Sequence, residues 1–401
     1  MQYAPKLSVQ TTSYCSQESI DVLSQLIAFN TVSRESNLEM IDWCQAYLAK
    51  LGITSRITYS DDRRKANLFA TIGDARRQGL VLSGHSDTVP VDNQAWRTDP
   101  FKATLIDNLV FGRGTADMKG FIAVCLAMAP RLLNTKGNKP FHLAITYDEE
   151  TTMLGARQLI ADLKDAGIHP SGCIVGEPTG MRVIVGHKGR RHIRCCVRGK
   201  EAHSSLTPQG VNAIEFSAKI IEFISQMAER HKAREQKNYG FDVPFTTIQT
   251  GTIRGGLTAN TVPRECDFDF EFRNLPWTDV DMLEKEVRDY ALTMLLPQML
   301  RQSASCEITF ETQSTFPPFG FGQEGEGLNP ELSNLLSRIG RKHSPLGFVG
   351  FGTEASWFQS AGIPTLICGP GSIEQAHKPN EHISLQQIGE CEKFIELIAC
   401  N

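Results

Sequence analysis

The sequence lacks a membrane-spanning hydrophobic run, a leader-like start and a net positive charge. Its apolar runs fall well short of the roughly 20 residues that cross a bilayer. Residues 1–19 show no cationic start followed by an apolar core, so no signal peptide is predicted. Because the formal net charge is −4 over 401 residues, we expect neither a nucleic acid nor a membrane as the main partner.

The cysteines follow no recognisable pattern. The 11 cysteines are scattered, none form Cys-x-x-Cys, and the one adjacent pair is Cys195 and Cys196. An odd number without regular spacing favours reduced thiols over a secreted disulfide framework. A cytoplasmic protein is therefore expected.

The order of the expected elements predicts an α/β domain in the first part of the chain. With 41% hydrophobic and 21% charged residues, the composition is that of a globular protein, and the length exceeds that of a usual single domain. From residue 16 to 176, apolar positions at helical spacing alternate with short apolar runs, which is typical of a mostly parallel sheet with helices on both faces. Helices are expected at 16–30, 37–51, 118–133 and 152–166, and strands at 53–59, 67–72, 79–84, 103–111, 141–147 and 172–176.

The pattern changes near Gly186 to that of a two-layer α+β domain. Strands are expected at 191–198, 245–254, 265–273 and 305–312, and helices at 211–232 and 278–299. After a connector at 316–327, a buried strand at 363–367 and a helix at 384–400 resume the first pattern. We therefore predict a discontinuous domain, residues 1–187 with 313–401, and a second domain, 188–312, inserted into it.

Two polar residues, His85 and Asp87, follow one of the apolar strands. Because they are two positions apart, an extended chain directs both side chains to the same face. The imidazole of His85 could bind a metal while the Asp87 carboxylate orients its ring. Alone, such a pair more often belongs to a surface loop.

More acidic residues and a second histidine lie at or beyond the ends of other strands, or just before a helix. These are Asp117, Glu149, Glu150, Glu177 and His377. Each has an ordinary alternative: Asp117 could be a helix N-cap, and Glu149 and Glu150 could be solvated loop acids. Because α/β sheets bind ligands beyond the carboxyl ends of their strands, we expect these side chains to converge.

Two histidines with carboxylates, and no cysteine, suit Zn²⁺, Co²⁺ or Mn²⁺ in a catalytic site. Two zinc ions and three carboxylates leave one positive charge, which a bridging hydroxide would balance. Such a site lowers the pKa of bound water to about 7. Since neighbouring residues point differently at a strand end, one of Glu149 and Glu150 can ligate while the other takes a proton from the water.

At these positions the sequence resembles a known family, the dizinc metallopeptidases that include acetylornithine deacetylases, succinyl-diaminopimelate desuccinylases, aminoacylases and carboxypeptidases. Segments that match the family in order and spacing are 84–90, 112–120, 148–151 and 176–179. Segments that resemble the acetylornithine deacetylases in particular are 115–120, 187–189, 352–355 and 369–373. The likeness covers nearly the whole chain.

The resemblance implies a ligand set for two Zn²⁺ ions per subunit, with Co²⁺ able to substitute. His85 and Glu177 would hold one metal. Glu150 and His377 would hold the other, and Asp117 would bridge the two.

Two more residues would act on this centre. The resemblance implies that Asp87 orients His85 and that Glu149 is the general base. The reacting group would be a hydroxide that bridges the metals.

The resemblance also implies that the inserted domain is a lid and a dimerisation domain of a homodimer. His203 would reach the active site of the partner subunit and help to hold the oxyanion, although a solvated loop histidine is the alternative. Asn260 and Arg273 match the lid residues. Arg273 could grip a substrate carboxylate, or it could form a salt bridge on a strand edge.

Glu354 raises a separate hypothesis about the substrate. Desuccinylases usually carry Ser-Asp where this chain has Glu354 and Ala355. A carboxylate there could pair with the δ-ammonium group of ornithine. The alternative is an acid that is favoured at a helix N-terminus by the helix dipole.

The activity that the resemblance implies is removal of the acetyl group from Nα-acetyl-L-ornithine, giving L-ornithine and acetate for arginine biosynthesis. Acetylcitrulline, succinyl-diaminopimelate or a broad range of N-acyl amino acids are alternative substrates. A silent relative that only binds acylated amino acids belongs to a different class. The presence of Glu149 and of all five metal ligands argues against it.

Overall fold

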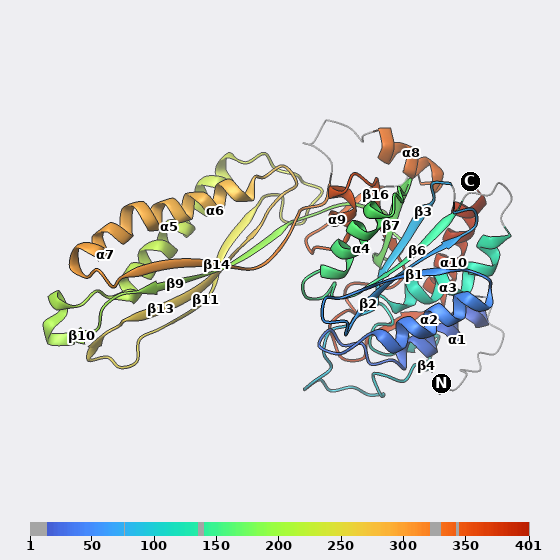
Figure 1. The fold of residues 1–401 in the computed structure, drawn as a ribbon, viewed down its shortest axis with the longest axis horizontal. Helices are drawn as coiled ribbons and strands as arrows, with labels where there is room; N and C mark the ends of the chain where they lie inside the picture. The colour runs from blue at the N-terminus through green and yellow to red at the C-terminus, as the bar shows by residue number, and fades with distance from the viewer. Residues whose placement is uncertain (1–13, 76, 135–139, 321–329, 342–344, 401) are drawn as a thin grey trace. The chain divides into compact units, whose positions relative to one another are not determined.

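The computed structural model describes residues 14–75, 77–134, 140–320, 330–341 and 345–400. Most of the segment tested for a signal peptide, and most of the predicted connector, lie outside these residues. The chain divides into two compact units (Figure 1). Unit 1 comprises Met1–Val185, Leu328–Gly347 and Thr353–Asn401, and unit 2 comprises Gly186–Gly327 and Phe348–Gly352.

An eight-stranded mixed sheet in the order β1-β2-β6-β3-β7-β16-β8-β15 forms the centre of unit 1. The strands are β1 (Ser55–Tyr59), β2 (Ala66–Ile72), β3 (Leu80–His85), β6 (Phe141–Thr146), β7 (Gly172–Pro178), β8 (Ile184–His187), β15 (Gly347–Val349) and β16 (Thr365–Gly369). The middle strands β6, β3, β7 and β16 run parallel, whereas β1–β2, β2–β6 and β8–β16 are antiparallel pairs. This confirms the predicted α/β class with a mostly parallel sheet.

Helices cover both faces of this sheet and bury its middle strands completely (Figure 1). Such strands are continuous apolar runs because neither face meets water. One face is covered by α1 (Gln17–Ile27), α2 (Leu38–Lys50), α3 (Lys119–Leu133) and α10 (Leu385–Cys400). The other is covered by α4 (Leu154–Asp165) and α9 (Ala355–Ser360), and α8 (Pro330–Arg338) packs against β16.

The single strand predicted at 103–111 is wrong. The segment forms a hairpin of β4 (Thr104–Ile106) and β5 (Leu109–Phe111), to which β17 (His382–Ser384) adds a third strand. Asp107 and Asn108 form the turn with φ of 49° and 62°. Both residue types tolerate this left-handed conformation, which two-residue hairpin turns require.

Unit 2 is the predicted two-layer α+β structure. Its antiparallel sheet has the order β11-β13-β9-β14. The strands are β9 (Arg190–Arg198), β11 (Thr247–Gly255), β13 (Glu265–Arg273) and β14 (Glu307–Phe316), with β10 (Ala202–His203) and β12 (Thr261–Val262) forming a separate short pair. The helical layer is α5 (Ala213–Arg234), α6 (Val280–Asp289), a π-helical turn (Tyr290–Leu295) and α7 (Leu296–Gln302) (Figure 1).

The core of unit 2 follows the period of two along its strands. In β13, Cys266, Phe268, Phe270 and Phe272 are buried in the cluster under the helices, and the residues between them are more exposed. Unit 2 continues beyond residue 312, where its C-terminal boundary was predicted, because β14 ends at Phe316.

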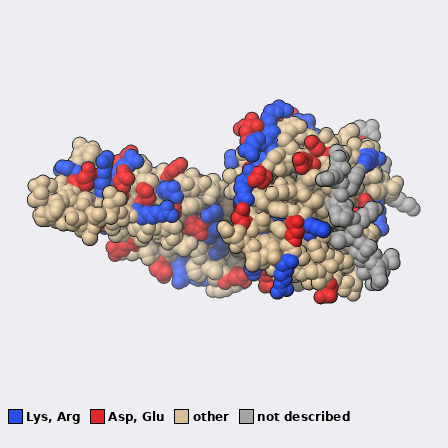
Figure 2. Space-filling view, turned by 90° about the horizontal axis from the view of Figure 1, so that it is seen from below, with Lys and Arg blue, Asp and Glu red and all other residues tan. Residues whose placement is uncertain are grey.

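Three general features accompany the fold. Among the described residues, no helix is long and apolar enough to cross a membrane. All 11 cysteines are free thiols. On the face in Figure 2, basic and acidic side chains are interspersed on both units, in keeping with the near-neutral composition.

Candidate metal centre

The predicted site residues of unit 1 converge at the carboxyl ends of the four parallel strands. The side chains are those of His85, Asp117, Glu149, Glu150, Glu177 and His377. They follow or end β3, β6, β7 and β16, except that Asp117 lies in the loop before α3. The topology therefore assembles residues that are up to 292 positions apart, from 85 to 377.

The ring of His85 is oriented by a main-chain atom. The side chain is fully buried, and Nδ1 lies 2.9 Å from the main-chain oxygen of Asp87. Because a carbonyl oxygen only accepts, Nδ1 is the donor, and in a neutral ring Nε2 keeps its lone pair. Nε2 faces Asp117 Oδ1 at 3.0 Å. Burial lowers the pKa of His85, but Asp117 and the nearby glutamates outweigh it and raise this pKa well above its usual value.

Asp117 lies between the two histidines. Its Oδ1 is 3.0 Å from His85 Nε2, and its Oδ2 is 3.3 Å from His377 Nε2. Glu150 approaches the same atom of His377, at 3.0 Å from Oε2. One carboxylate thus presents an oxygen to each histidine, which is the arrangement that a bridging ligand needs.

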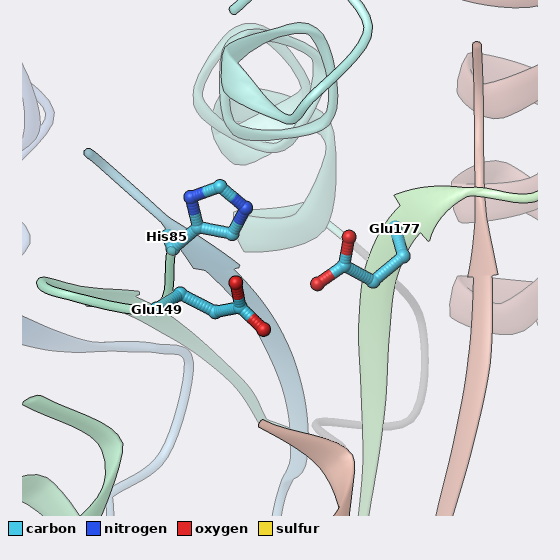
Figure 3. A group of neighbouring side chains, drawn as sticks. All are labelled: His85, Glu149 and Glu177. Atoms are coloured by element: carbon cyan, nitrogen blue, oxygen red, sulfur yellow. The ribbon is translucent and has the colours of Figure 1, made fainter. Parts of the chain in front are cut away.

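Glu149 and Glu177 share a second group with His85. Ligand atoms of these three residues lie within 4.8 Å of one another, as do those of His85, Asp117 and Glu150. In Figure 3 the three side chains point toward a common space from β3, from the loop after β6 and from β7. Among the described residues, neither Glu149 Oε1 nor Glu177 Oε1 has a hydrogen-bond partner, although both atoms are buried.

This concentration of buried carboxylates fits divalent cations. Burial raises the pKa of Glu149 and of Glu177 well above the usual value, and neighbouring carboxylates raise both further. Burial, with Asp117 beside it, raises the pKa of Glu150 to about 7. Buried acids with orphaned oxygens are costly unless a cation compensates them. Imidazole nitrogen and carboxylate oxygen are ligands suited to zinc, manganese or cobalt.

The Asp87 carboxylate has a role that the sequence did not indicate. It accepts hydrogen bonds from Ser33 Oγ at 2.7 Å and from the amides of Glu149 and Glu150 at 3.1 and 3.2 Å. The carboxylate itself is 3.7 Å from His85 Nδ1. Asp87 thus orients His85 through its main-chain oxygen and fixes the Glu149–Glu150 turn through its side chain.

Glu354, the residue predicted to pair with a substrate ammonium group, lies inside unit 1. Its side chain is fully buried, and its two oxygens accept hydrogen bonds from Ser83 Oγ and Thr146 Oγ1, both at 2.6 Å. Glu354 is at the N-cap of α9, but its side chain makes no capping hydrogen bond. Its hydrogen bonds connect the ends of β3 and β6, which carry or precede proposed metal ligands.

The predicted residues of the inserted domain lie in unit 2. His203 is exposed, and its Nδ1 lies 2.8 Å from Ser205 Oγ. In the β10–β12 strand pair, His203 lies opposite Thr261, the residue after Asn260. His203 and Asn260 are therefore neighbours on two exposed segments that lie side by side. Arg273 forms a salt bridge within its own inner strand, β13, with Nε 3.3 Å from a carboxylate oxygen of Glu271.

The sequence reasoning missed a buried ion pair, Arg113 with Glu381, at 2.7 Å. Arginine within a Gly-Arg-Gly turn was a visible signal. Its partner is 268 positions away, and no periodicity connects the two.

Comparison with known proteins gives consistent relatives over almost the full length. Residues 81–401 match peptidase family M20/M25/M40. The acetylornithine deacetylase of Aliivibrio fischeri (strain MJ11) is 34% identical over 374 residues, covering 92% of this chain and 94% of the relative. The acetylornithine deacetylase of Photorhabdus laumondii is 34% identical over 383 residues, covering 94% and 95%.

Solved structures share the fold at lower identity. The aminopeptidase PepT from Bacillus cereus matches with a TM-score of 0.72 at 20% identity, covering 96% of this chain and 98% of the other. A metallo-carboxypeptidase of the M20 family from Sulfolobus solfataricus gives 0.70 at 19% identity, with coverage of 96% and 100%. A dinuclear metal-binding M20 peptidase from Bacillus subtilis gives 0.65 at 14%, with coverage of 95% and 97%.

Proposed function

Since the chain belongs to peptidase family M20/M25/M40 and is a metal-dependent hydrolase, we propose that it deacetylates Nα-acetyl-L-ornithine. The products would be L-ornithine, for arginine biosynthesis, and acetate. The observation that carries the reaction class is the convergence of two histidines and four carboxylates at the strand ends. The substrate is supported by 34% identity to an acetylornithine deacetylase over 92% of this chain. The free thiols suit the reducing cytoplasm, where we expect the enzyme to act.

We assign two divalent ions, Zn²⁺ or Co²⁺, to this centre. His85 with Glu177 would hold one ion, and Glu150 with His377 the other. Asp117 would hold both, because its two oxygens face the two histidines. Bound ions would polarise the amide carbonyl and lower the pKa of water at the site.

Glu149 is the proposed general base. Its buried Oε1 makes no hydrogen bond within the described residues, so this atom is available to take a proton from the attacking water. The same carboxyl group then donates the proton to the leaving nitrogen. Burial raises the pKa of Glu149, which suits a group that must both accept and release a proton near neutral pH. The Asp87 carboxylate holds this turn in place through the Glu149 amide.

We further propose a homodimer in which unit 2 closes the site. His203 would stabilise the oxyanion in the partner subunit, with Asn260 beside it and Arg273 binding the substrate carboxylate. What supports this assignment is the exposure of the two adjoining segments that carry His203 and Asn260. The edge strand β11 and its loop also expose Ile253 at 52% and Leu257 at 99%, which a partner surface could cover.

The decisive experiment is hydrolysis of Nα-acetyl-L-ornithine by the purified protein. Activity should vanish after chelation and return as Zn²⁺ or Co²⁺ is added back to two ions per chain. Acetylcitrulline, succinyl-diaminopimelate and N-acetyl-L-methionine should be slower substrates under the same conditions. Faster turnover of one of these would overturn the substrate, and turnover that survives removal of all metal would overturn the mechanism.

A further inference from the structure

The Glu381 carboxylate is saturated by donors that lie next to a proposed metal ligand. The side chain is 1% exposed. Its Oε1 accepts hydrogen bonds from the amides of Ala116 and Asp117 at 2.9 and 3.0 Å. Its Oε2 accepts from the amide of Gly114 at 2.9 Å and from Arg113 Nη1 at 2.7 Å. One carboxylate therefore fixes the path of the chain into Asp117.

Arg113 extends these contacts to two other loops. Its Nη1 also lies 3.3 Å from the main-chain oxygen of Lys378, the residue after His377. Its Nη2 donates to Gln94 Oε1 at 2.7 Å and lies 3.5 Å from the main-chain oxygen of Pro90. Gln94 Nε2 in turn lies 3.4 Å from the main-chain oxygen of His377. The loops that follow β3, β5 and β16 are thus connected by one buried ion pair.

A buried ion pair by itself is weak support for stability, because desolvation offsets most of the attraction. This pair differs in where its hydrogen bonds go. Glu381 holds the Asp117 amide, and Arg113 contacts the main-chain oxygen of Lys378. Gln94, which accepts from Arg113, contacts the main-chain oxygen of His377. These contacts set the direction of two ligands that must share one ion.

We propose that Glu381 and Arg113 are positioning residues that align Asp117 with His377 and so create the second metal site. This inference rests on the proposed function, since it assumes that Asp117, His377 and Glu150 hold an ion. The pair touches neither the ion nor the substrate, and it acts only through the loops that carry the ligands.

The two ions should depend on this pair to different degrees. His85 is fully buried, ends a central strand and is held by its own hydrogen bond to Asp87. The side chain of His377 is 54% exposed and lies in a loop whose position depends on Arg113 and Gln94. Breaking the pair should therefore weaken the ion at His377 and spare the ion at His85 and Glu177.

The test is a calorimetric titration of the metal-free full chain with Zn²⁺, comparing wild type with Glu381→Gln. Glutamine keeps the size of the side chain but directs an NH₂ group at main-chain N–H donors, so part of the hydrogen-bonding set is lost. We expect the second ion to bind about 10–100-fold more weakly, with the first ion unchanged, because residues that support metal ligands have effects of this size. Raised zinc should restore hydrolysis in this variant.

Glu392→Gln is the matched control. Glu392 is also buried and accepts a hydrogen bond from the Ser16 amide at 3.1 Å and others from Ser16 Oγ and Ser19 Oγ, but these tie α10 to the start of α1. This variant should lose stability and keep both zinc affinities. Weakening of the second ion in Glu392→Gln as well would attribute the effect to general destabilisation and overturn the inference.

The remaining outcomes separate the inference from the proposed function. A wild-type protein that binds no metal would refute the proposed function. A wild type that binds two ions, with unchanged affinities in Glu381→Gln, would refute the inference alone. If circular dichroism shows that Glu381→Gln does not fold, Gln94→Ala decides. Gln94 is half-buried, and its replacement by alanine should lower the affinity for the second ion, by less than Glu381→Gln does. An unchanged affinity for the second ion in Gln94→Ala would refute the inference.

Discussion

At the scale of single residues, Glu149 and Glu150 show how two adjacent carboxylates come to differ. Both amides donate to the Asp87 carboxylate, which fixes the turn after β6. The turn then directs the Glu150 side chain to His377 and the Glu149 side chain into the group with Glu177. The division between ligand and base is therefore decided by the backbone of the turn.

Glu149→Gln should separate catalysis from metal binding. Glutamine cannot take a proton from water, so kcat should fall by about 10²–10⁴-fold while two ions still bind. Glu150→Gln is the neighbouring control and should lose affinity for one ion. Calorimetry with Zn²⁺ and steady-state kinetics on Nα-acetyl-L-ornithine measure both effects. Retained kcat in Glu149→Gln would rule out the assigned base.

Glu354→Gln distinguishes a supporting role from recognition of the substrate ammonium group. Because both oxygens of Glu354 accept hydrogen bonds from β3 and β6, the change should disturb the strand ends and lower kcat/KM by about 10–100-fold. The loss should be equal for Nα-acetyl-L-ornithine and for uncharged N-acetyl-L-methionine. A loss confined to acetylornithine would restore the ion pair that the sequence suggested.

Residue roles that depend on local sequence could be predicted, whereas roles that depend on contacts between distant segments could not. His85, Glu149 and Glu177 were visible because each stands at the end of an apolar run, where an α/β sheet places its ligands. The side chain of Glu354 could not be placed from the sequence, since its burial depends on how α9 packs on β7, β16 and α4. Such packing leaves no local pattern.

At the scale of elements, strong hydrophobic periodicity predicts helices reliably, whereas short strands and turns depend on other signals. The helices α1 (Gln17–Ile27) and α3 (Lys119–Leu133) form where apolar residues repeat at helical spacing. The predicted strand at 103–111 failed because it ran across the polar Asp107–Asn108 pair, which forms a turn. Short strands such as β8 and β17 gave no signal, because they form only by pairing with distant segments.

The strand β6 carries a buried histidine that predicts how stability depends on pH. His142 is 3% exposed, stacks on Phe69 and lies 3.0 Å from Thr71 Oγ1 through Nδ1. Burial lowers the pKa of His142 from 6.5 to about 4. Between these values the unfolded chain binds more protons than the folded one, so the free energy of unfolding falls as the pH falls.

His142→Gln should remove this part of the pH dependence. Between pH 7 and pH 5, His142 should lower the free energy of unfolding of the wild type by about 2 kcal/mol, a contribution that glutamine lacks. Urea unfolding of both proteins at the two pH values gives the difference, and comparing the two proteins cancels the titration of the carboxylates. Parallel losses in the two proteins would show that His142 does not titrate in this range.

At the scale of the whole molecule, the chain divides its chemistry between two units. All the proposed metal ligands and Glu149 belong to unit 1, whereas His203, Asn260 and Arg273 belong to unit 2. An antiparallel sheet with helices on one face leaves edge strands, such as β11, that can meet another chain. This division permits the proposal that a complete site draws on two subunits.

Complementation between two inactive variants tests that proposal. His203→Ala should lower kcat by about 10²–10³-fold through loss of an oxyanion donor. Glu149→Gln should be inactive for the separate reason given above. Each variant retains the residue that the other lacks. If His203 acts in the partner subunit, a heterodimer of the two has one intact site and one site with both defects.

The heterodimer can be obtained by co-expression with two different affinity tags and sequential purification. It should have about half the activity of the wild-type dimer, because one of its two symmetric sites is intact. If His203 acts on its own subunit, each site carries one defect and the heterodimer stays inactive. A chain that light scattering shows to be monomeric, yet fully active, would exclude action across a dimer altogether.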